Sequence, residues 1–103
     1  MLAWWWSRQE KAIAIDPALK VKVERALKTA CAGDPAPDIQ LEDVPPDKVA
    51  GQVLSVSFLA LSPTERQDRI WHHLDRELTP HERTRISFIV TDTPEEHRVL
   101  TGT

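Results

Sequence analysis

The feature that most constrains this chain is a capping side chain placed directly before proline, which recurs four times. An Asp, Ser or Thr side chain accepts a hydrogen bond from the free N–H groups of a first helical turn. Proline at the next position loses nothing, because its missing N–H would have had no partner there. In three cases a glutamate at the third helical position completes a capping box. The pairs are Asp16-Pro17, Ser62-Pro63, Thr79-Pro80 and Thr93-Pro94, and the glutamates are Glu65, Glu82 and Glu96. Helices are therefore predicted to begin near residues 17, 63, 80 and 94.

Apolar periodicity supports the two longer helices. Residues 17–31 place their apolar side chains on one stripe and most of their lysines and arginines elsewhere, which is typical of an amphipathic surface helix. The apolar side chains of residues 63–78 also fall on one side. A short turn or helix is expected at 80 and a last helical turn at 94. The predicted stripes are Leu19, Val23, Ala26, Leu27 and Ala30 in the first helix, and Ile70, Trp71, Leu74 and Leu78 in the second.

Three segments alternate polar and apolar side chains, as half-buried strands do. The first is Asp38–Val44, which ends at Pro45-Pro46. After a loop, the second is predicted at Gln52–Leu59, and the third is predicted at Arg85–Thr91. The side chains expected to share a face are Leu54, Val56 and Phe58 in the second strand, and Ile86, Phe88 and Val90 in the third.

The element order is therefore α-β-β-α-(α)-β-α. It predicts an α+β fold in which helices pack on one face of a three-stranded sheet. A chain of 103 residues is expected to hold a single core. We assign residues 16–103 to this domain and residues 1–15 to an N-terminal extension rich in tryptophan.

The extension begins with the apolar stretch Met1–Trp6, which Ser7–Lys11 ends at once. It lacks the basic start, the longer apolar segment and the cleavage site of a secretory signal. Adjacent tryptophans suit a lipid interface, where one edge of the ring is wet. The expectation that we favour is that one or two of them pack on the domain or on a partner subunit. The candidate contact residues here are Trp4, Trp5 and Trp6.

Composition excludes several classes of protein. A single cysteine, Cys31, excludes an intrachain disulfide framework and fits a reducing compartment such as the cytoplasm. The formal charge of −3, from 13 Lys and Arg against 16 Asp and Glu, provides no global positive field for nucleic acid. No apolar run approaches the roughly 20 residues that span a bilayer. A small binding module is the starting expectation.

Residues 58–78 resemble the central segment of BolA-like proteins. That family has a strand-ending Phe, then Ser, Arg, an aliphatic–aromatic pair, Leu and Glu-Leu in this segment, and the match here has no gap. Residues 91–96 also resemble the Thr-x-Thr-Pro-x-Glu close of the family. The resemblance implies a class II KH-like fold with the element order given above. The matching residues are Phe58, Ser62, Arg66, Ile70, Trp71, Leu74, Glu77 and Leu78.

The resemblance also implies three kinds of function: binding of protein partners, transcriptional regulation through a helix-turn-helix-like element at residues 63–82, and iron–sulfur binding with a monothiol glutaredoxin. The family's ligand histidine begins the last strand, where this chain has Arg85. A guanidinium cannot donate a lone pair to iron. Gln67 stands where the family places another histidine, and residues 45–51 hold neither His nor Cys. His81 is the candidate ligand, because a slip of two residues would bring it to the family position.

Ligand and catalytic patterns are otherwise sparse. His72 and His73 are neighbours on a helix and point about 100° apart, so they do not share a metal. Solvated surface histidines are the simpler expectation, and Cys31 is expected to be an inert, part-buried residue. No serine lies in a Gly-x-Ser-x-Gly setting, and no glycine-rich loop is present to cradle a phosphate. We therefore expect no enzyme and no cofactor.

Our first hypothesis is a non-enzymatic BolA-like module that acts through protein partners and docks around residues 58–85. The first alternative is a DNA-binding regulator that uses residues 63–85, and the second is an iron–sulfur carrier with a monothiol glutaredoxin. Because acidic residues lie three or four positions from these arginines, a monomer would need to gather basic patches in a homodimer to bind DNA. The candidate binding residues are Arg66, Arg69, Arg76, Arg83 and Arg85, with Trp4–Trp6.

Overall fold

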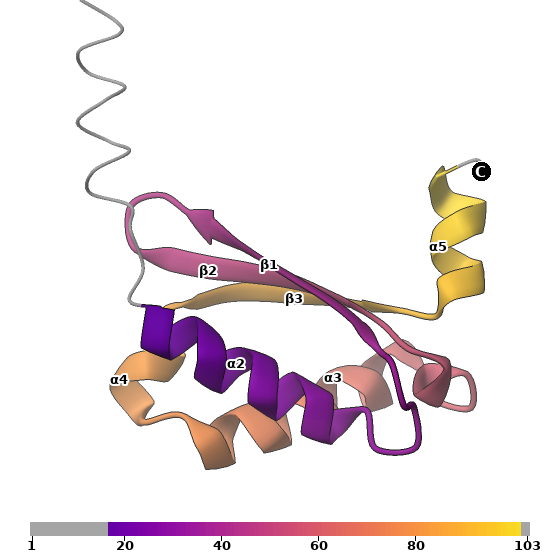
Figure 1. The fold of residues 1–103 in the computed structure, drawn as a ribbon, viewed down its shortest axis with the longest axis horizontal. Coiled ribbons are helices and arrows are strands. Elements are labelled where there is room, and N and C mark those ends of the chain that lie inside the picture. The colour runs from indigo at the N-terminus through magenta and orange to yellow at the C-terminus, as the bar shows by residue number, and fades with distance from the viewer. Residues whose placement is uncertain (1–16, 102–103) are drawn as a thin grey trace, which may run out of the picture.

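Two long helices cross one face of a three-stranded sheet in the computed structural model, which describes residues 17–101 (Figure 1). Strand β2 lies in the middle, antiparallel to β1 and parallel to β3. The predicted α+β fold with a three-stranded sheet is confirmed, while the N-terminal extension with Trp4–Trp6 lies outside the described residues. The elements are α2 (Pro17–Ala30), β1 (Asp38–Val44), β2 (Lys48–Leu54), the 3₁₀ turn η1 (Val56–Phe58), α3 (Pro63–Glu77), α4 (Pro80–Arg83), β3 (Ile86–Asp92) and α5 (Pro94–Thr101).

The three predicted capping boxes are all present. At the start of α3, the Glu65 N–H donates to Ser62 Oγ (3.2 Å), and the Ser62 N–H donates to Glu65 Oε1 (2.9 Å). Thr79 with Glu82 and Thr93 with Glu96 make the same pair of bonds at α4 and α5. Local side chains thus fix the first residue of each of these helices. Asp16 lies outside the described residues.

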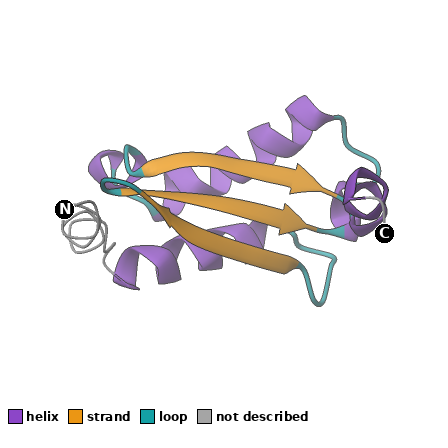
Figure 2. Ribbon diagram, turned by 90° about the horizontal axis from the view of Figure 1, so that it is seen from above, coloured by secondary structure: helices purple, strands orange, loops and turns teal. Residues whose placement is uncertain are grey.

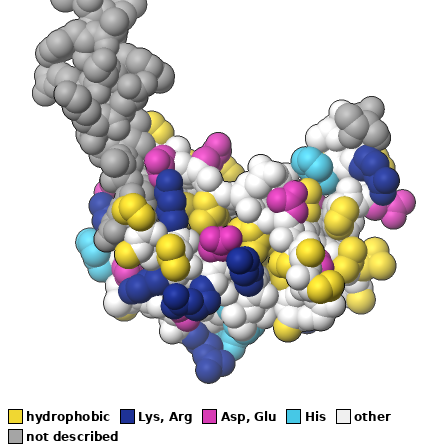
Figure 3. Space-filling model, viewed as in Figure 1, with side chains coloured by type: hydrophobic (Ala, Val, Ile, Leu, Met, Phe, Trp, Pro, Cys, Tyr) yellow, Lys and Arg dark blue, Asp and Glu magenta, His cyan; other side chains and the backbone are white. Residues whose placement is uncertain are grey.

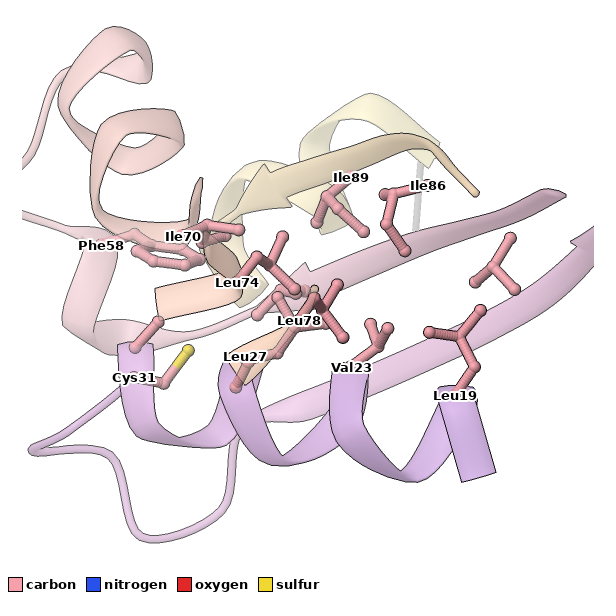
Figure 4. Close-up of a cluster of buried hydrophobic side chains, with 14 residues drawn as sticks. Leu19, Val23, Leu27, Cys31, Phe58, Ile70, Leu74, Leu78, Ile86 and Ile89 are labelled. Carbon is pink, nitrogen blue, oxygen red and sulfur yellow. The ribbon is translucent and has the colours of Figure 1, made fainter. Parts of the chain in front are cut away.

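The core lies between the helices and the sheet (Figure 4). The whole predicted stripe of α2 is buried, as are Ile70, Leu74 and Leu78, whereas Trp71 is half-buried. Cys31 was expected to be part-buried and is fully buried. The strands contribute Val49, Val53, Ile86 and Ile89 to this core. No helix in residues 17–101 is long and apolar enough to span a membrane.

The prediction of a strand at Gln52–Leu59 is wrong. Strand β2 begins at Lys48, directly after a tight turn, and ends at Leu54. It ends there because Asp34 accepts hydrogen bonds from Ser55 Oγ (2.8 Å) and from the Val56 N–H (3.2 Å). Asp34 lies 21 residues before Ser55 in the sequence. The chain then turns into η1, which buries Phe58 and leaves Val56 exposed.

The faces predicted for the third strand are also wrong. Ile86 and Ile89 are buried, whereas Phe88 is 51% exposed and Val90 is 39% exposed. The cause is a register shift: Val49 pairs with Ile86 but Ala50 pairs with Phe88, so β3 carries one extra residue. A bulge of this kind breaks the alternation of faces along a strand.

Helix α5 does not lie on the same face of the sheet as the other helices, which differs from the expectation that all helices pack on one face. Helices α2 and α3 lie below the sheet in Figure 1, whereas α5 rises from the end of β3 on the other side. None of its residues is buried. Its first turn is tied to the domain, and His97 Nδ1 lies 3.3 Å from Gln52 Nε2 on β2. The rest of this sheet face is uncovered in the described part of the chain (Figure 2).

Because Gly51 has no side chain, side chains from the two outer strands can approach each other across the central strand. A Cβ atom at this position would lie 2.9 Å from Leu41 Cδ2 and 3.0 Å from Ile89 Cδ1, which is closer than carbon atoms pack. Both neighbours pair directly with Gly51, one on each side. The missing side chain therefore makes room for an apolar contact on the core face of the sheet.

We predict that Val23→Ala lowers the free energy of unfolding by about 2 kcal/mol, because it leaves a cavity at a fully buried position. Val21 lies on the same helix and is 53% exposed, so Val21→Ala should change stability by less than about 0.5 kcal/mol. Urea denaturation of both variants measures the difference. Equal losses would contradict the placement of α2 on the core.

Candidate interaction surface

Arg66 is the most highly connected of the candidate arginines, and it is buried. Only 5% of the residue is exposed. Its Nε donates to the carbonyl oxygens of Phe58 (3.1 Å) and Leu61 (3.0 Å). Nη1 and Nη2 donate to the two carboxylate oxygens of Glu96 at 2.7 and 3.1 Å. Arg66 therefore joins α3 to η1 and α5 and is not displayed for a partner.

The Arg66–Glu96 pair also sets the ionisation of the carboxylate. The hydrogen bonds from Arg66, followed by the one from the Thr93 N–H, lower the pKa of Glu96 to about 2. The bidentate geometry is the strongest form of this pairing, because two parallel N–H···O bonds act on one carboxylate. The first turn of α5 is thus held by a charge that persists across the neutral and mildly acidic range.

The other four candidate arginines lie nearer the surface. Arg83 Nε lies 2.8 Å from Asp75 Oδ1, and its guanidinium lies 5.5 Å from the centroid of the Trp71 ring. Arg85 is 3.8 Å from Asp47. Arg69 and Arg76 are exposed on α3. Helix α3 and its neighbours therefore do not gather these five side chains into one positive site.

The basic residues of α2 bind neighbouring elements. Lys20 pairs with Asp43 on β1 (2.7 Å), and Lys22 pairs with Glu82 at the start of α4 (3.0 Å). A third pair joins Arg25 to Glu77 at the end of α3. These ion pairs fix the orientation of α2, and they reduce the positive charge that α2 presents to a phosphate backbone.

The histidines are dispersed. His81 is exposed on α4, and His72 and His73 form an edge-to-face pair on α3 with ring centroids 5.4 Å apart. Burial lowers the pKa of His73. Within residues 17–101, no group of three or more His, Cys, Asp or Glu side chains is arranged to hold a metal ion.

Cys31 belongs to a buried polar cluster at the end of α2. Ser55 is fully buried beside it and donates to Asp34, and its Oγ lies 2.7 Å from Ser57 Oγ. Burial raises the pKa of the Cys31 thiol, which disfavours the reactive thiolate. The cluster fixes the turn into η1 and offers no accessible nucleophile.

Gln67, which the resemblance to BolA-like proteins aligns with a histidine of that family, makes structural contacts. Its Nε2 donates to the carbonyl oxygen of Ile89 (2.8 Å) and to Thr91 Oγ1 (3.3 Å). Its side-chain oxygen accepts a hydrogen bond from Trp71 Nε1 (3.2 Å). The side chain bridges α3 and β3, so an amide with both a donor and an acceptor suits this position.

An apolar surface lies between α5 and the residues that follow η1. A groove of about 560 Å³ separates α5 from Leu59, which directly follows η1, and from Pro63 at the start of α3; we call it the η1–α5 groove. Leu59 is 72% exposed, and Val99 and Leu100 are each 75% exposed. Figure 3 shows hydrophobic side chains gathered at the end of the molecule that carries α5. The groove is lined by Leu59, Pro63, Thr91, Thr93, Val99 and Leu100, together with charged groups discussed below.

Only part of this groove falls within the docking region expected at residues 58–85. Val99 and Leu100 were not among the binding residues predicted from the sequence, because residues from 94 onward were expected to form only a last helical turn. The sequence signal that could have identified these two residues is an apolar pair that follows a well-capped, acidic first turn. No element in the described part of the domain covers this pair.

Comparison with protein-family models, with curated proteins and with solved structures finds no match. The BolA-like assignment therefore stays a prediction from the residues that carry the resemblance.

We predict that Arg66→Met lowers the free energy of unfolding by about 3 kcal/mol, because it removes a buried donor from two carbonyls and from Glu96. Arg69→Met, on the exposed side of the same helix, is the matched control and should cost less than about 0.5 kcal/mol. Urea denaturation near neutral pH measures both changes. A similar small loss in both variants would mean that Arg66 does not hold α3, η1 and α5 together.

We predict that Glu96→Gln destabilises the domain near neutral pH and that its deficit relative to wild type shrinks as the pH falls. The pKa of Glu96 is about 2 in the folded chain and about 4.3 in an unfolded chain. A lowered pKa stabilises the fold above the unfolded value, and this contribution is lost as pH falls from about 4.3 toward about 2. Urea denaturation between pH 7 and pH 2.5 measures the trend, with Glu95→Gln as the control. A deficit that does not change with pH would contradict the assignment.

Proposed function

We propose that this chain is a non-enzymatic, cytoplasmic interaction module that binds a protein partner in the η1–α5 groove. The partner that fits is an amphipathic helix with apolar side chains on one face and lysine or arginine beside them. The resemblance to BolA-like proteins supports a role through protein partners. The single observation that carries the proposal is the clustering of exposed apolar side chains at this groove.

Exposed hydrophobic side chains are unevenly distributed over the surface of the described residues. Seven large hydrophobic side chains are exposed in the described residues, and three of them line the groove: Leu59, Val99 and Leu100. Scattered exposed hydrophobic residues are normal on a protein, whereas a contiguous patch marks an interaction site. Val99 and Leu100 lie on a helix with no buried residue, so they contribute little to the stability of the domain itself.

The charges of the groove indicate the sign of the partner. Arg66, Asp92, Glu95 and Glu96 line it, which gives one positive and three negative charges and a net charge of −2. The positive charge of Arg66 is already paired with Glu96. Asp92 and Glu95 remain beside the apolar floor and favour a cationic partner. Helix-in-groove recognition uses this combination of apolar anchors and rim charges.

The two alternatives receive less support from the geometry. For DNA, Arg83 and Arg85 already pair with carboxylates, and Arg66 is buried, so few of the candidate arginines are displayed. For an iron–sulfur cluster, the candidate ligand His81 lies on α4, at the opposite end of the domain from α5 (Figure 1). We therefore propose the protein partner first.

The test is a titration of the ¹⁵N-labelled chain with a synthetic amphipathic helix made of leucine and lysine, followed by NMR. We expect amide shifts confined to residues 56–63 and 91–101, because the apolar face and the lysines match the groove and its charge. Leu100→Asp should weaken binding at least about tenfold, which corresponds to roughly 1.4 kcal/mol. A peptide with glutamate in place of lysine should bind much more weakly.

Val21→Asp is the matched control, since Val21 is exposed on α2, away from the groove. It should leave peptide binding unchanged. Shifts spread over the whole surface, or equal losses in Leu100→Asp and Val21→Asp, would contradict the proposed site. No binding by the wild-type chain at millimolar peptide would contradict the partner chemistry.

A further inference from the structure

The uncovered face of the sheet is a second apolar surface, separate from the η1–α5 groove. At its centre lies a hollow of about 260 Å³. Phe88 and Val90 are 51% and 39% exposed there, because the bulge in β3 turns them away from the core. Figure 2 views this face with the strands in front and α2 and α3 behind them. We call it the open sheet face, lined by Gln40, Glu42, Ala50, Gln52, Phe88 and Val90.

The chemistry of the open sheet face suits an indole ring. Phe88 and Val90 on β3 offer aromatic and apolar contact, and Ala50, which pairs with Phe88 on the neighbouring strand β2, is small enough to leave a depression. A buried tryptophan also needs an acceptor for its N–H group. The Gln40 amide oxygen and the Glu42 carboxylate lie along one rim and provide such acceptors.

The chain itself carries a segment of this kind close by. Residues 1–6 contain Trp4, Trp5 and Trp6 and no charged side chain. The described chain begins with α2, and Lys20 in its first turns lies 2.7 Å from Asp43, next to Glu42 on the rim. The ten intervening residues, 7–16, span up to about 33 Å when extended, whereas the three strands are only about 10 Å across.

We propose that residues Met1–Trp6 of the same chain pack on the open sheet face, with tryptophan side chains against Phe88 and Val90. The linking residues 7–16 carry two basic side chains, Arg8 and Lys11, and two acidic ones, so they have no net charge that would repel them from Asp38 and Glu42 on the edge strand β1. A short tether gives such a segment a local concentration of about millimolar, which favours it over a second copy or a separate partner.

The proposal does not rest on the partner assigned to the η1–α5 groove. In the proposed arrangement residues Met1–Trp6 cover one apolar face of the domain, and the groove at α5 remains the surface open to partners. Failure of either proposal leaves the other standing, because different residues carry them.

The test uses tryptophan fluorescence of the full chain carrying Trp71→Phe, so that the signal comes from Trp4–Trp6 alone. A synthetic peptide of residues 1–15 provides the solvated reference. We expect the chain to emit at a shorter wavelength than the peptide and to have less than half of its acrylamide quenching constant, independent of protein concentration. Val90→Asp should restore the values of the peptide.

Val99→Asp is the matched control, because it makes the same change on α5, outside the open sheet face, and should leave the fluorescence unchanged. Emission and quenching equal to those of the peptide would overturn the proposal. Protection that disappears on dilution would assign the face to a second copy and would overturn it as well. So would protection that is lost in Val99→Asp and kept in Val90→Asp.

A second measurement covers the case in which a substitution prevents folding. Wild-type chain labelled with 5-fluorotryptophan gives ¹⁹F signals whose shift between H₂O and D₂O reports exposure to solvent. We expect a reduced shift for at least one of the N-terminal tryptophans relative to the labelled peptide. Full shifts for all three would overturn the proposal.

Discussion

The fold depends on one buried positive charge. Arg66 lies on α3, and its donors hold the carbonyls of Phe58 and Leu61 as well as the carboxylate of Glu96. Burying a guanidinium is unfavourable unless its donors are satisfied, so α3, η1 and α5 must be placed together around it. The position of α5, and hence the shape of the η1–α5 groove, follows from this requirement. The stability of the domain and its candidate binding surface thus share one side chain.

The helices could be predicted from the sequence because their signals are local. A cap, a proline and a glutamate within four residues determine where α3, α4 and α5 begin, and the apolar stripe of α2 determines which side is buried. The strands could not be predicted as well. The end of β2 depends on Asp34, which is 21 residues away from Ser55, and the faces of β3 depend on its pairing with β2. Alternation within a strand carries no information about a bulge.

The same distinction applies to the candidate site. The sequence predicts that the arginines pair with acidic residues three or four positions away, but Arg66 and Arg25 pair with carboxylates that are distant in the sequence. Glu96 lies 30 residues from Arg66, and Glu77 lies 52 residues from Arg25. An arginine chosen as a surface contact is therefore an internal anchor. The apolar pair on α5 was visible in the sequence, but only the fold shows that η1 brings Leu59 beside it to form a groove.

Gly51 restricts which residues can occupy the positions beside it on β1 and β3. Because the methyl groups of Leu41 and Ile89 already occupy the place of its side chain, these three positions share a fixed volume on the core face. A homologue with alanine or valine at position 51 would have to carry a smaller residue at position 41 or 89, or space its strands differently. Evolution at these positions is then expected to be correlated, and such covariation would reveal the strand order from an alignment alone.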